Sequence, residues 1–271
     1  MSQPELEAFE LELLGGGIEH RYRRMRPEVE AMPWDSFDPS LYDADVLVAA
    51  RSAWTRAAFQ EHRTAAACAL ALRTLIETRA PLDLVGLATR FPLDEIVHVE
   101  LCARMATVAG GGTEIRHRPD DLIKDPPEGL SPLARAADIV TRVFCVGEAL
   151  SIPLLRGAWH AAKHPLPRAI LGRIVRDEAA HGTFGFTFLD WALPQMNASE
   201  RASVGHAADR AISSIHALWR EIAAGAEPLD STAHPLGWMR TDSYLALAER
   251  SMRSRVIEPL RARGVALATA S

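Results

Sequence analysis

Two short segments of this sequence carry the same pattern, Asp94-Glu95-Ile96-Val97-His98 and Asp177-Glu178-Ala179-Ala180-His181. In an α-helix, residues three apart lie on one face with their side chains about 5–6 Å apart, so the glutamate and the histidine of each segment could bind one metal ion together. A single Glu-x-x-His arises by chance in many helices. Two copies, each preceded by aspartate, predict a repeated metal-binding unit.

The sequence around both segments is typical of long helices. Hydrophobic residues make up 48% of the 271 residues, and β-branched runs bounded by turns are scarce. Apolar residues at three- and four-residue steps predict helices over about 45–78, 81–108 and 131–162, and a fourth that follows Pro165 and Pro167 and continues to about 193. Two further helices are predicted at about 198–224 and 242–263. The predicted fold class is all-α.

The connections between these helices differ in length. Pro92 predicts either a kink in the second helix or a break with proline in the first turn of a new helix. Residues 110–130 are rich in Gly, Asp and Pro, and a loop this long suits a crossover along the length of a helical bundle. Residues 1–43, rich in Pro, Gly and charge, predict an irregular arm packed on the main body, and 265–271 a C-terminal tail.

The first and third helices each place one carboxylate in an apolar stripe. Glu61 lies on the face of Trp54, Ala58 and Cys68, and Glu148 is flanked at helical spacing by Phe144 and Ile152. Glu61 precedes Glu95 by 34 residues, and Glu148 precedes Glu178 by 30. At about 1.5 Å per residue, one helix out and one back brings each glutamate level with its partner motif. The six Glu and His residues are therefore predicted to converge.

Burying four carboxylates requires compensating positive charge. The sequence offers no obvious set of arginines or lysines on the inward faces, so we expect two divalent cations to balance the four charges and two neutral imidazoles to complete the ligation. Asp94 is expected to reach His181, and Asp177 to reach His98, because a ligating imidazole usually donates its other N–H to a carboxylate. Phe144 and Ser151, each about one turn from Glu148, are candidates for lining an oxygen or substrate pocket.

The order Glu, Asp-Glu-x-x-His, Glu, Asp-Glu-x-x-His over residues 61–181 resembles the ferritin-like diiron-carboxylate proteins, which take a glutamate from each of two helices and Glu-x-x-His from the other two. The resemblance implies a ferritin-like four-helix bundle within one helical domain over 44–264, with a long crossover between its second and third helices. It also implies a catalytic site of two iron ions, or less often manganese, ligated by Glu61, Glu95, His98, Glu148, Glu178 and His181.

The sequence departs from several members of that group. The three tyrosines, Tyr22, Tyr42 and Tyr244, lie outside the core helices, which disfavours the radical role found in ribonucleotide reductase small subunits. No Cys-x-x-Cys module of the rubrerythrin kind is present, and storage ferritins are shorter. Arylamine N-oxygenases carry a further histidine one turn before the last glutamate, where this chain has Ile174.

The function implied is a non-heme diiron oxidase or oxygenase that uses dioxygen to oxidise a small organic substrate by hydroxylation, N-oxygenation or desaturation. An external electron donor is expected because the sequence has no flavin or Fe–S motif. Two alternatives stay open: a dimanganese catalase or peroxidase, and a ferritin-like metal-handling protein without organic chemistry.

Charge and hydropathy exclude other classes. A net charge of −5 without a basic stripe disfavours nucleic acid as a partner, and no apolar run approaches the roughly 20 residues that a membrane span requires. With no leader pattern at the N-terminus, a cytoplasmic location is expected. Cys68, Cys102 and Cys145 each fall in an apolar helical pattern and are expected to be free buried thiols. The oligomeric state is not determined, and a homodimer stays open.

Overall fold

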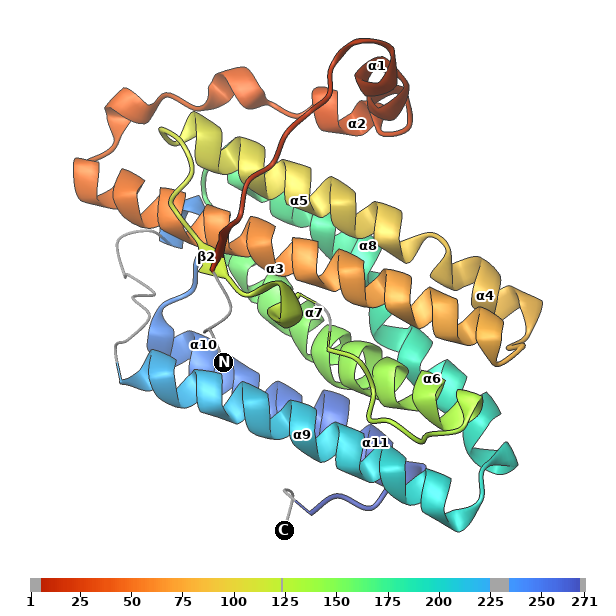
Figure 1. Cartoon of the computed structure of the whole chain (residues 1–271). Helices are drawn as coiled ribbons and strands as arrows, with labels where there is room; N and C mark the ends of the chain where they lie inside the picture. The colour runs from red at the N-terminus through yellow and green to blue at the C-terminus, as the bar shows by residue number, and fades with distance from the viewer. Residues whose placement is uncertain (1–5, 123, 225–233, 269–271) are drawn as a thin grey trace.

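The computed structural model describes residues 6–122, 124–224 and 234–268, and this part of the chain is predominantly helical (Figure 1). The predicted all-α class is confirmed. Four long helices are α3 (Ala44–Glu77), α5 (Phe91–Val108), α7 (Ala149–Ala161) and α8 (Pro165–Ala192). α3 packs along α5, α7 packs along α8, and α5 contacts α8. The two helix pairs therefore meet where α5 and α8 carry their repeated segments.

Pro92 begins a helix instead of bending one. The chain forms the short helix α4 (Leu82–Ala88) and then starts α5 at Phe91, with Pro92 in its first turn. Proline is suited to this position because the first N–H groups of a helix have no partner within the helix. Of the two arrangements expected at Pro92, the break is therefore correct.

The predicted third helix is interrupted by a π-helical segment. It consists of α6 (Pro132–Val140), the π-helix η4 (Thr141–Glu148) and α7. The hydroxyl of Ser131 accepts a hydrogen bond from the N–H of Ala134 and so caps the start of α6. A π-turn inserts an extra residue and changes the direction of the side chains after it, and such segments are frequent at functional sites. Glu148 is the last residue of η4.

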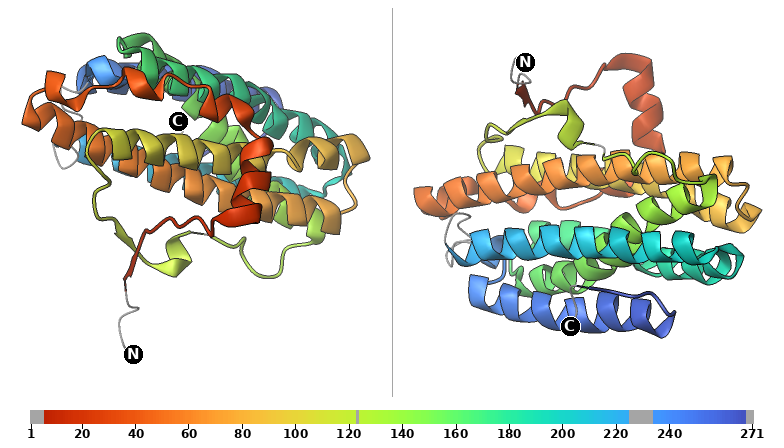
Figure 2. Two further views of the ribbon diagram at one scale, coloured as in Figure 1. Left: turned by 90° about the horizontal axis from the view of Figure 1, so that it is seen from above. Right: turned by 60° about the horizontal axis from the view of Figure 1, so that its bottom comes forward.

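The long connection between α5 and α6 runs along the molecule from the end of one helix to the far end of the other (Figures 1 and 2). It contains the strand β2 (Arg116–His117) and the 3₁₀ turn η3 (Pro119–Asp121). β2 pairs antiparallel with β1 (Glu7–Ala8), with Glu7 opposite His117. The connection thus also fixes the N-terminal arm to the body.

The prediction of an irregular N-terminal arm holds only in part, because the arm contains α1 (Gly16–Arg24), α2 (Pro27–Glu30) and the 3₁₀ turns η1 (Trp34–Ser36) and η2 (Pro39–Leu41). An ion pair one turn apart, Arg23 to Glu19 at 2.6 Å, supports α1. Arg26 is 1% exposed and pairs with Glu100 of α5 at 2.7 Å and with Glu30 at 2.6 Å. These contacts hold the arm on α5; residues 1–5 lie outside the described chain.

The C-terminal helices cover the second helix pair. η5 (Leu193–Gln195) leads to α9 (Ala198–Ala223), which packs on α6 and η4. After η6 (His234–Leu236), α10 (Thr241–Ser251) packs on α7 and continues through the π-helix η7 (Met252–Ile257) into α11 (Glu258–Ala262). Figure 2 (right) shows α10 and α11 as the outermost layer, next to α9. The tail is described to residue 268, and 269–271 lie outside the described residues.

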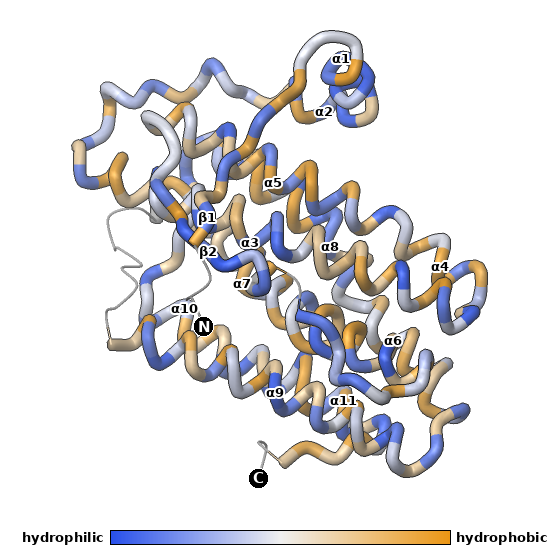
Figure 3. The backbone as a smooth tube through the Cα atoms, viewed as in Figure 1, coloured by the Kyte–Doolittle hydropathy of each residue, from blue (hydrophilic) through white to orange (hydrophobic). Residues whose placement is uncertain are grey.

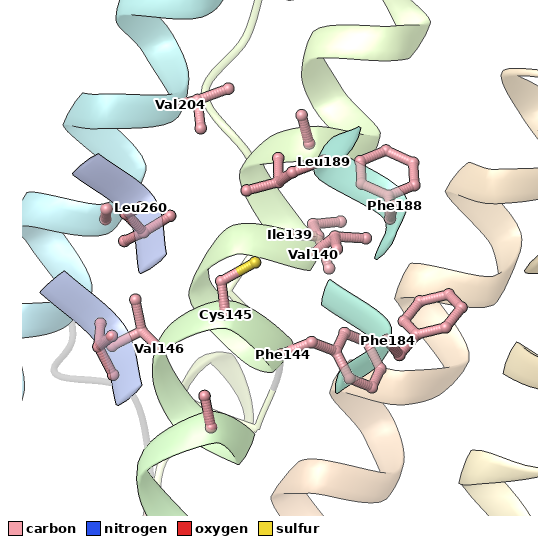
Figure 4. Packing of buried hydrophobic residues seen from close by; sticks show 14 of the residues in the cluster. Ile139, Val140, Phe144, Cys145, Val146, Phe184, Phe188, Leu189, Val204 and Leu260 are labelled. Carbon is pink, nitrogen blue, oxygen red and sulfur yellow. The ribbon is translucent and has the colours of Figure 1, made fainter. Parts of the chain in front are cut away.

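Apolar residues recur along every long helix instead of gathering in one of them (Figure 3), as expected where each helix buries one face. In the larger cluster, Phe144 of η4 lies beside Phe184 of α8, while Val146 faces the helix that carries Leu260 (Figure 4). All three cysteines are free and buried, as predicted. Within the described ranges, no helix combines the length and the apolar character needed to cross a membrane.

Glycine allows α8 to approach η4 closely, and replacing Gly185 with alanine is expected to push them apart. A Cβ there would lie 2.7 Å from Cys145 Sγ and 2.8 Å from the Cys145 backbone nitrogen, so η4 must shift. We expect a loss of about 1–3 kcal/mol in the free energy of unfolding, measured by urea denaturation. Gly86→Ala in α4 is the matched control, since a Cβ there meets nothing within 4 Å. Equal stability of the two variants would contradict the packing argument.

Candidate metal centre

All six predicted ligands come together between the helices. Their ligand atoms form two groups, each with its atoms within 4.8 Å of one another: Glu61, Glu95, His98 and Glu178 form one, and Glu95, Glu148, Glu178 and His181 form the other. Glu95 and Glu178 belong to both groups. The arrangement is therefore two adjacent candidate metal sites that share two carboxylates, each completed by one histidine and one further glutamate.

Both imidazoles point the same nitrogen, Nδ1, at the shared carboxylates. Nδ1 of His98 lies 3.6 Å from Glu95 Oε2 and 3.3 Å from Glu178 Oε1. Nδ1 of His181 lies 3.0 Å from Glu95 Oε1 and 3.1 Å from Glu178 Oε2. One oxygen of each shared glutamate thus faces each histidine, which is the geometry that a carboxylate bridging two ions requires.

These close atoms are buried without hydrogen bonds. The Nδ1 atoms of both histidines, both carboxylate oxygens of Glu95 and Oε2 of Glu178 have no hydrogen-bond partner. A buried polar atom without a partner is costly, and charged groups are more costly still. Five unpaired donor atoms aimed at one small region fit a pair of metal ions, which would bind them directly.

The outer nitrogen of each histidine contacts an aspartate from the other repeat. His98 Nε2 lies 3.1 Å from Asp177 Oδ2 in a hydrogen bond, and His181 Nε2 lies 3.5 Å from Asp94 Oδ2. Both pairs were expected from the sequence. The hydrogen bond of His98 fixes which of its ring nitrogens is free to bind metal. The contact of His181 with Asp94 is not a hydrogen bond in the structure.

No set of arginines was expected on the inward faces, and the two arginines close to the centre contact its aspartates and not its glutamates. Arg90 pairs with Asp94 at 2.8 Å and approaches Asp177 at 3.4 Å, and Arg173 pairs with Asp177. These arginines neutralise the two aspartates, whereas the four glutamates are left to metal ions or to protonated imidazoles. The signal was present in the sequence, because each arginine lies four residues before its aspartate, so that Arg-x-x-x-Asp-Glu-x-x-His is the full repeated unit.

Changing Asp177 to asparagine is expected to weaken metal binding by about 10–100-fold, because the loss of a partner that orients a ligating histidine typically has this effect. Asparagine keeps the shape but can present an N–H to His98 in place of the accepting oxygen. Titration of the apo-protein with Mn²⁺, followed by calorimetry, measures the change. Asp190→Asn is the control, since Asp190 lies on the same helix but forms an exposed pair with Arg263. Unchanged affinity in the first variant would refute the role of Asp177.

Without metal, the cluster must hold protons. Burial raises the pKa of Glu61 to about 8, and burial together with the charges of Glu178 and Glu95 raises the pKa of Glu148 well above its usual range. Desolvation opposes charge on His181, but its contacts with Asp94, Glu178 and Glu95 outweigh this and raise its pKa to about 12. The pKa of His98 is likewise raised, against desolvation, by the carboxylates of Glu178, Glu61 and Glu95.

Binding of two divalent cations is therefore expected to release about four protons at pH 7, one each from Glu61, Glu148, His98 and His181. All four groups have a raised pKa and lose their proton when metal replaces it, so the affinity for metal rises with pH. Calorimetric titration with Mn²⁺ in PIPES and in Tris, which differ in ionisation enthalpy, gives the number released. The Glu148→Gln variant, which lacks the unshared glutamate of the His181 site, should bind one ion and release about two protons fewer, those of Glu148 and His181. Release of no protons would show that the metal-free cluster is already deprotonated.

A cavity of about 410 Å³ is connected to Glu148 through Ser151, which lines it. Its walls come from α3, α7, α9 and residues 238–244, and they include Gln60, next to Glu61, and Ser151. The hydroxyl of Ser151 lies 3.0 Å from the backbone oxygen of Glu148 and 3.3 Å from its Oε2. Ser151 thus lies where the sequence placed it, between a pocket and a candidate ligand.

Phe144 was expected to line a pocket, but it is not part of this cavity wall. Its ring is fully buried and lies 5.3 Å from Phe91 and 5.0 Å from Phe184, measured between ring centroids. Phe91 in turn lies 4.3 Å from the His181 ring. The π-helical η4 changes the direction of side chains relative to Glu148, so Phe144 supports the His181 side of the centre from the core.

Comparison of the chain with family models, with curated proteins and with solved structures finds no match.

Proposed function

We propose that this chain is a non-heme diiron oxidoreductase of the ferritin-like type, which uses dioxygen to oxidise a small organic molecule. The observation that carries the proposal is the pair of donor groups that share Glu95 and Glu178. The two helix pairs and the long connection between α5 and α6 also support it, because they match the bundle with one crossover that is typical of ferritin-like proteins.

The donor set suits iron and, as an alternative, manganese. Each site would take three carboxylates and one imidazole, a mixture that both metals accept, and the absence of cysteine among the ligands disfavours soft metals. Two iron ions held there would supply the redox chemistry for dioxygen activation. Electrons would come from an external donor.

The residues around the centre would hold its geometry. Glu95 and Glu178 set the separation of the two sites, while Asp177 and Asp94 orient the imidazoles of His98 and His181. Ser151 restrains the carboxylate of Glu148, which belongs to only one site. Glu61 is the ligand most open to its surroundings, with a side chain 16% exposed. An unshared and partly exposed carboxylate is the one best placed to move when substrate binds.

The cavity that Ser151 joins to Glu148 favours an organic substrate over peroxide alone. Leu154, Leu155 and Ile222 contribute to its mainly apolar wall, and a cavity of about 410 Å³ is within the range that holds small organic ligands. Catalase chemistry and iron storage need no such space. The apolar wall would also exclude water from the reacting atoms.

The experiment combines metal analysis with a variant that fills the cavity. Protein purified without added metal is assayed by elemental analysis and Mössbauer spectroscopy, and the reduced protein is then exposed to dioxygen with a panel of small apolar acids and amines. Mass spectrometry should detect products that have gained oxygen or lost two hydrogens. Ala158→Phe, which fills the cavity, should keep two ions per chain and lose this oxidation, whereas Ala53→Ser should keep both.

The alternatives give different results. Two manganese ions with rapid turnover of peroxide in the absence of substrate would support a catalase. Ferrous oxidation without any organic product, unaffected by Ala158→Phe, would support a metal-handling protein. A chain that binds neither iron nor manganese would refute the proposal.

A further inference from the structure

A second cavity, of about 920 Å³, lies on the other side of α7 and is bounded by α8 and the N-terminal arm. Arg156 and His160 of α7 line it, together with Arg168, Arg173 and Arg176 of α8. Glu28 of the arm is the only acidic residue in its lining. The cavity thus concentrates positive charge in a chain whose net charge is −5.

Three of the four arginines, Arg156, Arg168 and Arg176, form no ion pair with a described residue. Arg173 is neutralised by Glu28 at 2.8 Å and by Asp177. Arg156 and Arg176 are exposed, and neither forms an ion pair with any residue in the described part of the chain. Like charges gathered in a concave site repel one another unless an anion neutralises them.

The cavity also offers directed donors. Arg168 is fixed, because its guanidinium donates to the backbone oxygens of Trp159 and Ala162 and lies 5.0 Å over the Trp159 ring. The floor beneath is Gly172, where a Cβ would come within 3.1 Å of Trp159 Nε1. That indole N–H donates no hydrogen bond to a described residue. The cavity lining therefore combines guanidinium groups with the indole of Trp159.

We infer that this cavity binds a phosphate-bearing ligand, held by Arg156, Arg168 and Arg176. Guanidinium groups match the oxygens of phosphate in a fork-like geometry, and one phosphate group presents more oxygens to neighbouring arginines than one carboxylate does. The phosphate could be free or part of an organic ester whose apolar part lies on Trp159. This site is separate from the metal centre and does not depend on the proposed oxidation.

The test is calorimetric titration of the full-length protein with inorganic phosphate, pyrophosphate, phenyl phosphate and succinate. The double variant Arg156→Gln with Arg176→Gln is compared with a control that loses the same charge elsewhere, Arg135→Gln with Arg220→Gln, on α6 and α9. All six glutamate and histidine ligands remain in both double variants, so an anion held by the metal centre would bind to both equally.

We expect the phosphate anions to bind the wild type and the control variant with affinities within about twofold of each other. The variant with Arg156→Gln and Arg176→Gln should bind them at least about tenfold more weakly. Tighter binding of phenyl phosphate than of inorganic phosphate would identify an ester as the ligand, and the reverse order a free phosphate. Absence of phosphate binding, an equal loss in both double variants, or succinate binding as tightly as pyrophosphate would overturn the inference.

Discussion

Replacing Glu178 with glutamine is expected to abolish binding of both metal ions, whereas the same change at Glu61 leaves one ion bound. Glu178 presents one oxygen to His98 at 3.3 Å and the other to His181 at 3.1 Å, and it belongs to both donor groups. Glu61 belongs only to the group that contains His98. Loss of a shared carboxylate therefore removes a ligand from each site at once.

The expected loss of affinity at both sites exceeds about 100-fold for Glu178→Gln, since losing a direct ligand should cost more than losing an orienting partner. Elemental analysis after equilibration with a slight excess of Fe²⁺ or Mn²⁺ under anaerobic conditions gives the number of ions per chain. Glu221→Gln, at an exposed position of α9, is the control for a lost charge. If the Glu61 and Glu178 variants bind the same number of ions, the two glutamates do not differ in the way that the geometry requires.

Removal of the metal ions is expected to lower the stability of the whole protein strongly. The ligands are buried between α3, α5, η4 and α8 with several atoms unpaired, so ions that bind only the folded state add stability. At free metal about 100-fold above Kd, each site contributes about 2.7 kcal/mol, or about 5 kcal/mol for two. This corresponds to a difference of roughly 10–20 °C in Tm.

Thermal unfolding followed by circular dichroism, with and without a chelator, measures this difference. The Glu178→Gln variant is the control, because a chain that binds no metal should unfold at the same temperature in both conditions. A wild-type Tm that does not respond to the chelator would mean that the buried carboxylates and imidazoles are satisfied by protons alone, and that the cluster is not a metal centre.

The two candidate ligand pairs on α5 and α8 followed from the sequence because their spacing is local. Glu95 and His98 lie on the same face of their helix wherever that helix packs in the fold, and so do Glu178 and His181. Helix ends were also readable, since α3, α8 and α9 begin and end within a few residues of the predicted bounds. The ion pairs of Arg90 and Arg173 obey the same local rule and could have been read from their four-residue spacing to Asp94 and Asp177.

Other features depend on contacts between segments far apart in the chain. Which glutamates are shared is decided by the approach of α5 to α8, and the direction of Phe144 by a π-helix that no apolar period indicates. The arm is ordered by Arg26, buried against Glu100 some seventy residues away. The sequence alone thus determined the helices and the chemistry on each face, because these rest on neighbours along one helix. Only the tertiary structure decided which helix faces meet and where the cavities lie, because contacts between different helices follow no repeating spacing along the sequence.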